Sequence, residues 1–227
     1  MTALTSIKSV RAAGAIIFCM VASVAAGIEP AITLPEPRRD SAYPLERAFA
    51  ERRSVREFRD TELRLEELAQ LLWAAQGQVT RSGHRTAPSA GALYPLELFV
   101  VAGNVQGLAA GVYRYQSSPH RLAPLAEGDR RQRLVEAAWS QRWLAQAPAI
   151  LVIAGVERRT TVKYGARGVR YVHLEAGHAA QNVLLQAVAL GLGATVVGAF
   201  NDGDVKAAAV LRDDEQPLYL IPVGRPR

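Results

Sequence analysis

The chain has 227 residues, 49% of them hydrophobic and 21% charged, which is the composition of an ordinary globular protein. Its formal charge of +6 suggests an anionic partner, but the basic residues are scattered and form no stripe with aromatic side chains, which argues against nucleic-acid binding. The single cysteine, Cys19, lies within the first 26 residues. Residues 27–227 contain no cysteine, so they cannot form disulfides, supply a thiol nucleophile, or bind a metal or iron–sulfur cluster through cysteine.

The first 26 residues have the pattern of a secretory signal peptide. Lys8 and Arg11 form a short basic region, residues 12–25 are apolar and uncharged, and small residues surround Ala26, where cleavage is expected. The apolar run is short for a membrane-spanning helix. The pattern predicts export to the periplasm, with no stable membrane span after cleavage. The alternatives are an uncleaved segment that anchors the protein to a membrane, or a cytoplasmic protein.

Residues 27–44 carry four prolines and are predicted to form an extended arm or linker ahead of a domain that spans residues 45–227. A short helix is expected at 45–52. Residues 61–76 have the clearest helical pattern, because their leucines recur on one face and Gly77 follows where a helix would stop. The polar segment 78–87 is predicted to be a loop.

The rest of the chain alternates irregularly between strand-like and helix-like segments. Apolar runs predict strands at 96–102, 111–115, 149–154, 194–200 and 218–223. Helices are predicted at 130–144 and 171–190. The second is apolar around most of its circumference and is expected to be buried, either in its own core or against a second subunit. This order favours a mixed α+β sandwich over a doubly wound parallel sheet, and no G-x-G-x-x-G motif supports a Rossmann nucleotide site.

Two segments carry features that suit a phosphate-bearing, planar ligand. In the run R-R-S-V-R at 52–56, an extended backbone would project Arg52, Ser54 and Arg56 to one side as a phosphate clamp, the alternative being a solvated charged turn. In R-T-A-P-S-A-G at 85–91, the small residues Pro88, Ser89, Ala90 and Gly91 would let backbone amides approach a flat ring.

Three further features are candidates for chemistry or binding. The adjacent Lys163 and Tyr164 could act as a general acid or base in a cleft, or could be ordinary charges of a surface loop. Three glycines bracket the apolar run 191–200, which suits either a close approach to a ring or a helix end followed by a core strand. Arg225 follows a predicted strand, where it could reach a phosphate or remain an exposed arginine. The spacing of His173 and His178 does not fit a helical zinc site, and no metal is expected.

Taken in order, these segments resemble the nitroreductase-like flavoproteins, and within them the SagB/ThcOx-type dehydrogenases that include azoline oxidases. The matching motifs cover nearly everything from Glu51 to the end of the chain. They are R-R-S-V-R-x-F at 52–58, L-L-W-A-A-Q-G at 71–77, R-T-A-P-S-A-G-A-L-Y-P-L-E at 85–97, K-Y-G-x-R-G-x-R-Y at 163–171, L-E-A-G-H-A-A-Q-N at 174–182, G-L-G-A at 191–194, G-A-F-N-D at 198–202 and P-V-G-R-P at 222–226.

The resemblance implies a homodimeric α+β fold, a three-layer sandwich with a mixed, mainly antiparallel sheet and FMN at the subunit interface. It implies that the motif at 52–56 grips the ribityl phosphate together with Arg225, and that Pro88–Gly91 lines the isoalloxazine from the partner subunit. The segment around 196–199 would lie against the other side of the ring, and Lys163 and Tyr164 would form the proton-handling pair. The residues expected to bind the cofactor are Arg52, Arg53, Ser54, Arg56, Pro88, Ser89, Ala90, Gly91, Val197, Gly198, Ala199 and Arg225.

The function that follows is two-electron transfer through FMN to or from a small organic or peptide-derived substrate. Either a reduced substrate is oxidised, as in the SagB-type dehydrogenases, or NAD(P)H supplies electrons for the reduction of an electrophile. The alternative is a non-catalytic protein that binds or sequesters a flavin on the same fold.

Overall fold

The computed structural model describes residues 30–227, so the predicted signal peptide lies outside the described residues. Within them the chain forms one seven-stranded sheet of order β1-β4-β3-β2-β5-β7-β6, in which all neighbouring strands run antiparallel. The strands are β1 (Ile32–Thr33), β2 (Leu96–Ala102), β3 (Gly111–Ser117), β4 (His120–Glu127), β5 (Ala149–Gly155), β6 (Gly193–Ala194) and β7 (Gln216–Gly224).

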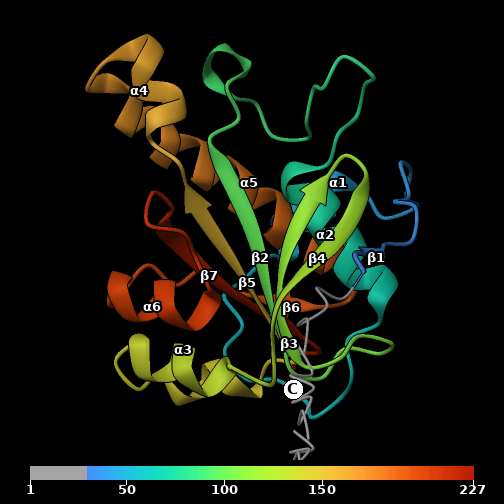
Figure 1. Ribbon diagram of the computed structural model, residues 1–227. Helices are drawn as coiled ribbons and strands as arrows, with labels where there is room; N and C mark the ends of the chain where they lie inside the picture. The colour runs from blue at the N-terminus through green and yellow to red at the C-terminus, as the bar shows by residue number, and fades with distance from the viewer. Residues whose placement is uncertain (1–29) are drawn as a thin grey trace, which may run out of the picture.

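The two central strands, β2 and β5, are apolar on both faces and therefore pack on both sides. In β2, Leu98 and Val100 join one hydrophobic cluster, whereas Phe99 and Val101 join a second cluster on the opposite face. All four side chains are buried. A strand that must bury both faces needs a layer of helices on each side, and this produces three layers (Figure 1).

The helices supply the two outer layers. One face of the sheet is covered by α2 (Leu65–Gln76) and α5 (Arg167–Ala189), which pack on each other, with α1 (Leu45–Glu51) against α5. The other face is covered by α3 (Arg131–Ala137) and α6 (Asp202–Ala209), while α4 (Arg158–Tyr164) stands at one end, beside the start of α5. The predicted α+β sandwich with a mainly antiparallel sheet is confirmed.

The proline-rich arm packs on the domain over its described part. β1 pairs with β4 through Ile32 and Thr33, and the Leu34 amide donates to the His120 carbonyl at 3.1 Å. Farther along, Arg38 exchanges two hydrogen bonds with the Gln70 side chain on α2. The arm therefore covers the first part of β4 at one edge of the sheet.

The helix predicted at 61–76 begins only at Leu65, and two other predicted elements differ more strongly in extent. The predicted strand at 194–200 is reduced to the two residues of β6, because the chain then turns away and only Val197 returns to form an isolated bridge with Leu220. The predicted helix at 130–144 is α3 followed by a short 3-10 helix, Arg142–Gln146. Trp139 and Ser140 between them have φ values of 51° and 62°, which a helix cannot contain.

Candidate functional site

The predicted phosphate-binding segment runs extended beside β6. The Val55 amide donates to the Ala194 carbonyl at 3.2 Å, and Val55 packs so closely on Gly193 that a Cβ there would lie 2.6 Å from its methyl carbon. Glycine is therefore required at Gly193 for this segment to lie where it does. Because side chains alternate along an extended backbone, Arg53 and Val55 line a cavity of about 150 Å³ beside β6, whereas Arg52, Ser54 and Arg56 face away from it.

The arginines of this segment, Arg52, Arg53 and Arg56, form no ion pair within the described residues. A hydrogen bond from Tyr43 and, to a smaller extent, the charge of Arg53 nevertheless lower the pKa of nearby Glu51. Arg56 lies over the Trp143 ring at 5.8 Å. Ser54 and Arg56 are exposed. A run of cations without carboxylate partners is able to accept a phosphate without first breaking an ion pair.

Arg225 is held differently from these arginines. Its guanidinium donates to the Leu190 carbonyl at 3.1 Å and forms an ion pair with Glu67 at 2.5 Å. Burial acts to raise the pKa of Glu67, but hydrogen bonds from Arg64 and Arg225 outweigh it and hold the pKa below its ordinary value. Arg225 thus fixes the end of β7 to the start of α2, close to the predicted clamp but already paired.

Val197, Gly198 and Ala199, which are predicted to lie against the flavin ring, follow β6 in the chain. Val197 is buried and exchanges backbone hydrogen bonds with Leu220 at 2.8 and 2.9 Å. Gly198 and Ala199 are exposed, and the Ala199 carbonyl accepts a hydrogen bond from the Gln141 side chain. Val197 is thus hydrogen-bonded to β7, whereas Gly198 and Ala199 are accessible to solvent.

The turn at Pro88–Gly91 is anchored by a buried glutamate that sequence reasoning did not assign. Glu175, on α5, accepts hydrogen bonds through one oxygen from the Ser89 hydroxyl at 3.0 Å and the Ala90 amide at 2.8 Å. Its second oxygen is buried without a partner among the described residues, and burial raises the pKa of this carboxyl. Glu175 occurs in the quoted motif L-E-A-G-H, but nothing local in the sequence indicates that it contacts a turn so far away in the chain.

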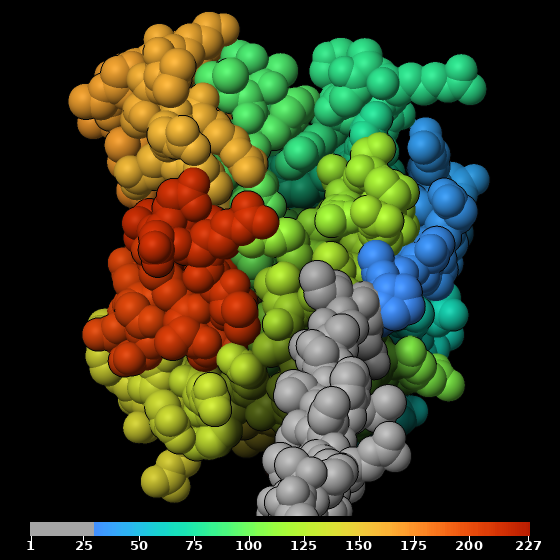
Figure 2. Space-filling model, in the orientation of Figure 1, coloured from blue at the N-terminus to red at the C-terminus, as the bar shows by residue number. Residues whose placement is uncertain are grey.

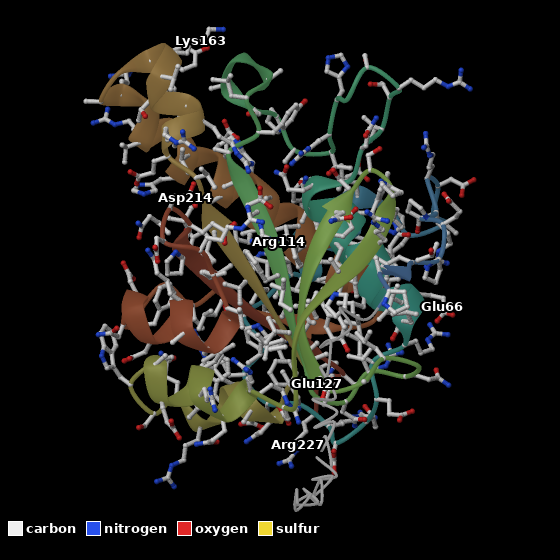
Figure 3. All side chains as sticks on the ribbon, in the orientation of Figure 1. Glu66, Arg114, Glu127, Lys163, Asp214 and Arg227 are labelled. Atoms are coloured by element: carbon white, nitrogen blue, oxygen red, sulfur yellow. The ribbon has the colours of Figure 1, made fainter. Side chains whose placement is uncertain are left out.

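The structure brings Lys163 and Tyr164 to this turn. Both lie at the end of α4, and a Cβ at Gly91 would lie 2.8 Å from the Lys163 amine and 2.8 Å from the Tyr164 hydroxyl. Gly91 has a φ of 62°, and Ala92 and Tyr94 beside it also have positive φ. Figures 2 and 3 show α4, which carries Lys163 at its outer end, adjoining the green segment that contains the turn. Strained backbone next to titratable side chains is typical of functional sites.

The predicted site residues thus form two groups within the chain. Arg225 binds the carbonyl of Leu190, which follows the last residue of α5, whereas Glu175 holds the Pro88–Gly91 turn from the N-terminal half of the same helix. At 1.5 Å rise per residue, these two positions on α5 are about 22 Å apart. The chain alone does not bring the phosphate-binding group into contact with the turn and the Lys163–Tyr164 pair.

The described residues contain neither a metal-binding cluster nor a membrane-spanning helix. Within residues 30–227, no group of three or more histidine, aspartate or glutamate side chains is arranged to hold a metal ion. None of the helices described there combines the length and apolarity needed to cross a membrane.

Removing Glu175 should release the turn. We expect Glu175→Ala to lower the free energy of unfolding by about 1–3 kcal/mol, because Ser89 and Ala90 would lose their acceptor, whereas Glu175→Gln keeps one and should cost less. The raised pKa means that the folded state holds the proton more tightly than the unfolded state. The stability of the wild type relative to Glu175→Gln should therefore fall as the pH rises from the ordinary glutamate pKa through the raised pKa of the folded state. Urea unfolding at several pH values measures both, and equal losses for the two variants would contradict the acceptor role.

Comparison with known proteins gives consistent matches over most of the chain. The model of the nitroreductase family matches residues 49–225. A protein of Methanocaldococcus jannaschii named as a candidate nitroreductase, MJ1384, is 46% identical over 181 residues, which cover 80% of this chain and 90% of that protein. The Escherichia coli Microcin B17-processing protein McbC is 32% identical over 130 residues, which cover 55% of this chain and 47% of McbC.

Solved structures agree with these sequence matches. A crystal structure of a candidate nitroreductase from Ralstonia eutropha superposes with a TM-score of 0.76 and 34% identity, over 87% of this chain and 90% of that one. The NADPH:FMN oxidoreductase of Vibrio harveyi, complexed with NAD+, superposes with a TM-score of 0.58 and 19% identity, over 80% of this chain and 68% of that one. At that identity the second match concerns the fold alone.

Proposed function

Because this chain belongs to the nitroreductase family, we propose that it is an FMN-dependent oxidoreductase that transfers two electrons to or from a small organic or peptide-derived substrate. The observation that carries the proposal is the position of Lys163 and Tyr164 beside Gly91. This contact puts two groups able to move a proton at a turn whose backbone is exposed at Gly91 and can approach a planar ring. A protein that only binds a flavin has no need of such a pair.

The residues present suit FMN. Arg52, Ser54 and Arg56 offer two unpaired guanidinium groups and a hydroxyl for a phosphate. Gly198 is exposed, and a Cβ there would meet only the Tyr219 ring at 3.7 Å, so the backbone has room for close approach of a ring. When bound, FMN would supply the hydride chemistry at its ring. The chain would hold the phosphate at 52–56, orient the ring with the Pro88–Gly91 turn, and move a proton at the Tyr164 hydroxyl or the Lys163 amine.

A homodimer would complete this arrangement. The two groups of site residues lie about 22 Å apart along α5, so a ring bound near one group would need the turn of a second copy. Leu45 and Phe49 on α1 and Leu174 on α5 are more than half exposed, although they are large and apolar. Exposed apolar side chains on adjacent helices are typical of a subunit interface. We therefore propose FMN sites shared between two subunits.

The direction of electron transfer separates two forms of the proposal. The match to McbC and the motif K-Y-G at 163–165 favour a SagB-type dehydrogenase that oxidises its substrate. The higher identity to MJ1384 over more of the chain favours a reductase supplied by NADH or NADPH. The export signal proposed for residues 1–26 would put either reaction outside the cytoplasm.

An absorption spectrum tests the proposal. The purified protein is mixed with FMN, freed of excess, and titrated with NADPH and then NADH without oxygen. We expect retained flavin bands. Bands that bleach would support the reductase form, and bands that persist would support a dehydrogenase reduced only by its own substrate. A protein that retains flavin but reacts with no donor or candidate substrate would favour the non-catalytic alternative, and a protein that retains none would overturn the proposal.

A further inference from the structure

A split in the sheet forms a cavity that is lined in part by Arg85, three residues before the Pro88–Gly91 turn. β2 and β3 pair only from Phe99 with Arg114 to Ala102 with Gly111, and the first residues of β2 pair with β5 alone. Figure 1 shows the two strands diverging toward the end of the sheet where α4 stands. The cavity there has a volume of about 310 Å³ and is lined by Leu96–Leu98, residues 114–118 and side chains from outside the two strands.

Three arginines line this cavity, and the carboxylates near them are already in use. Glu97 binds Arg114 at 2.9 Å and Arg159 at 2.5 Å, and Glu215 binds Arg114 at 2.7 Å. Arg114, at the centre of the sheet in Figure 3, is therefore neutralised from two sides. Arg85 and Arg212 also line the cavity, and neither has an ion-pair partner among the described residues. The cavity is left with a net positive charge.

Arg85 is the more buried of these two cations. Its guanidinium donates to the Gln76 side-chain oxygen at 3.0 Å and lies over the Tyr94 ring at 4.6 Å, so its contacts are with neutral groups. Burial lowers the pKa of Arg85, and the nearby Glu97, which forms no ion pair with it, offsets this effect only in part. A guanidinium in this state, with donors still free, is well suited to a bidentate anion.

The cavity is connected to the candidate proton-transfer pair by direct contacts. Tyr94, which stacks on Arg85, has its carbonyl bound by Arg159 at 3.1 Å. Arg159 lies one helical turn before Lys163 on α4. The Pro88–Gly91 turn lies between Arg85 and Tyr94 in the chain and contacts Lys163 and Tyr164. Tyr94 and Arg159 thus link the cavity residue Arg85 to this turn and to α4.

We propose that the cavity between β2 and β3 binds the carboxylate of a small organic substrate, and that Arg85 selects for this negative charge. The inference rests on the proposed oxidoreductase function and narrows it to anionic substrates. Arg85 is a specificity-determining residue in this scheme, Arg114 gives the cavity its shape through its ion pairs, and the exposed Arg212 adds charge at the entrance.

The test compares two acceptors that differ mainly in charge, 4-nitrobenzoate and 4-nitrobenzyl alcohol. NADPH oxidation gives kcat/KM for each, in the wild type and in Arg85→Gln, Arg85→Lys and Arg81→Gln. Arg81 is an exposed arginine of the same loop that does not line the cavity, so its variant is the matched control. Calorimetric titration of each protein with 4-nitrobenzoate measures binding without any turnover, and thermal melts confirm folding.

We expect the wild type to prefer 4-nitrobenzoate and Arg85→Gln to lose about tenfold or more of that preference, because a charge-assisted hydrogen bond is lost. Arg85→Lys should retain part of the preference, and Arg81→Gln all of it. An Arg85→Gln variant with an unchanged preference and unchanged titration would overturn the inference. The inference would also be overturned if Arg85→Gln lost a preference for NADPH over NADH while its preference between the two acceptors stayed unchanged. The anion bound by Arg85 would then be the phosphate of the donor.

Failure of the proposed function would be recognised separately. If the protein oxidises no NADPH with either acceptor, the calorimetric titration alone tests whether the cavity binds a carboxylate. Binding of 4-nitrobenzoate that is about tenfold weaker in Arg85→Gln than in Arg81→Gln would still support the anion site. Equal binding in both variants, or none in the wild type, would contradict it.

Discussion

Tyr164→Phe is expected to retain its flavin and to lower kcat by about 10²-fold or more, because it removes the phenolic proton that the proposed reaction uses. The ring itself should stay in place. It packs edge-on against Tyr171, with ring centroids 5.1 Å apart and an interplanar angle of 84°, and phenylalanine preserves that contact. Flavin absorbance gives the cofactor content, and steady-state kinetics with the substrate found active gives kcat and KM.

Tyr171→Phe is the matched control for this variant. It removes the neighbouring hydroxyl, which accepts a hydrogen bond from Arg167 at 3.1 Å and lies outside the predicted catalytic pair. We expect it to keep nearly full activity. A Tyr164→Phe variant as active as Tyr171→Phe would remove Tyr164 from the acid–base role and leave Lys163 as the candidate.

The second large effect is expected at the phosphate-binding segment. Replacing Arg52 and Arg56 together with glutamine should weaken FMN binding by about 10²-fold or more, since each charge-assisted contact contributes about 1.5–3 kcal/mol. Neither arginine forms an ion pair in the described chain, so the fold should lose little stability. Fluorescence titration with FMN measures the affinity.

Arg59→Gln provides the comparison, because Arg59 is exposed and follows the motif by only a few residues. Its FMN affinity should match the wild type. Arg225 is a less suitable target, since its removal would also take a partner from the buried Glu67 and mix a loss of stability with a loss of binding. An unchanged affinity in the double variant would contradict the proposed clamp.

Sequence alone predicts those elements whose burial leaves a strong local pattern. β2 was expected at 96–102 and lies there, because a run of apolar residues that packs on both faces is unmistakable. α5 begins at Arg167, earlier than the expected 171, since its first turn is polar and carries no apolar periodicity. β4, α4 and α6 were not predicted, because partly exposed segments with mixed side chains look like loops when their packing partners are unknown.

The candidate site is predictable only as a set of separate pieces. Motif resemblance selects Lys163, Tyr164 and Gly91, but only the fold shows that they meet, since α4 and the turn are far apart in the chain. The anchoring role of Glu175 and the contacts of Arg85 with Gln76 and Tyr94 are likewise tertiary properties. The assignment of each residue to FMN or to catalysis remains a prediction that the variants above test.

The docked arm sets where a stable fragment of this protein can begin. The family match starts at residue 49, but Ile32 and Thr33 pair with Leu122 and Arg121 on the outer edge of β4. A fragment that started at 45 would leave the backbone N–H and C=O groups of β4 open to a strand from another molecule, which promotes self-association. The proline-rich arm thus protects this part of β4 from pairing with another molecule. Because the arm contains prolines and pairs over only two residues, it offers no long strand edge of its own.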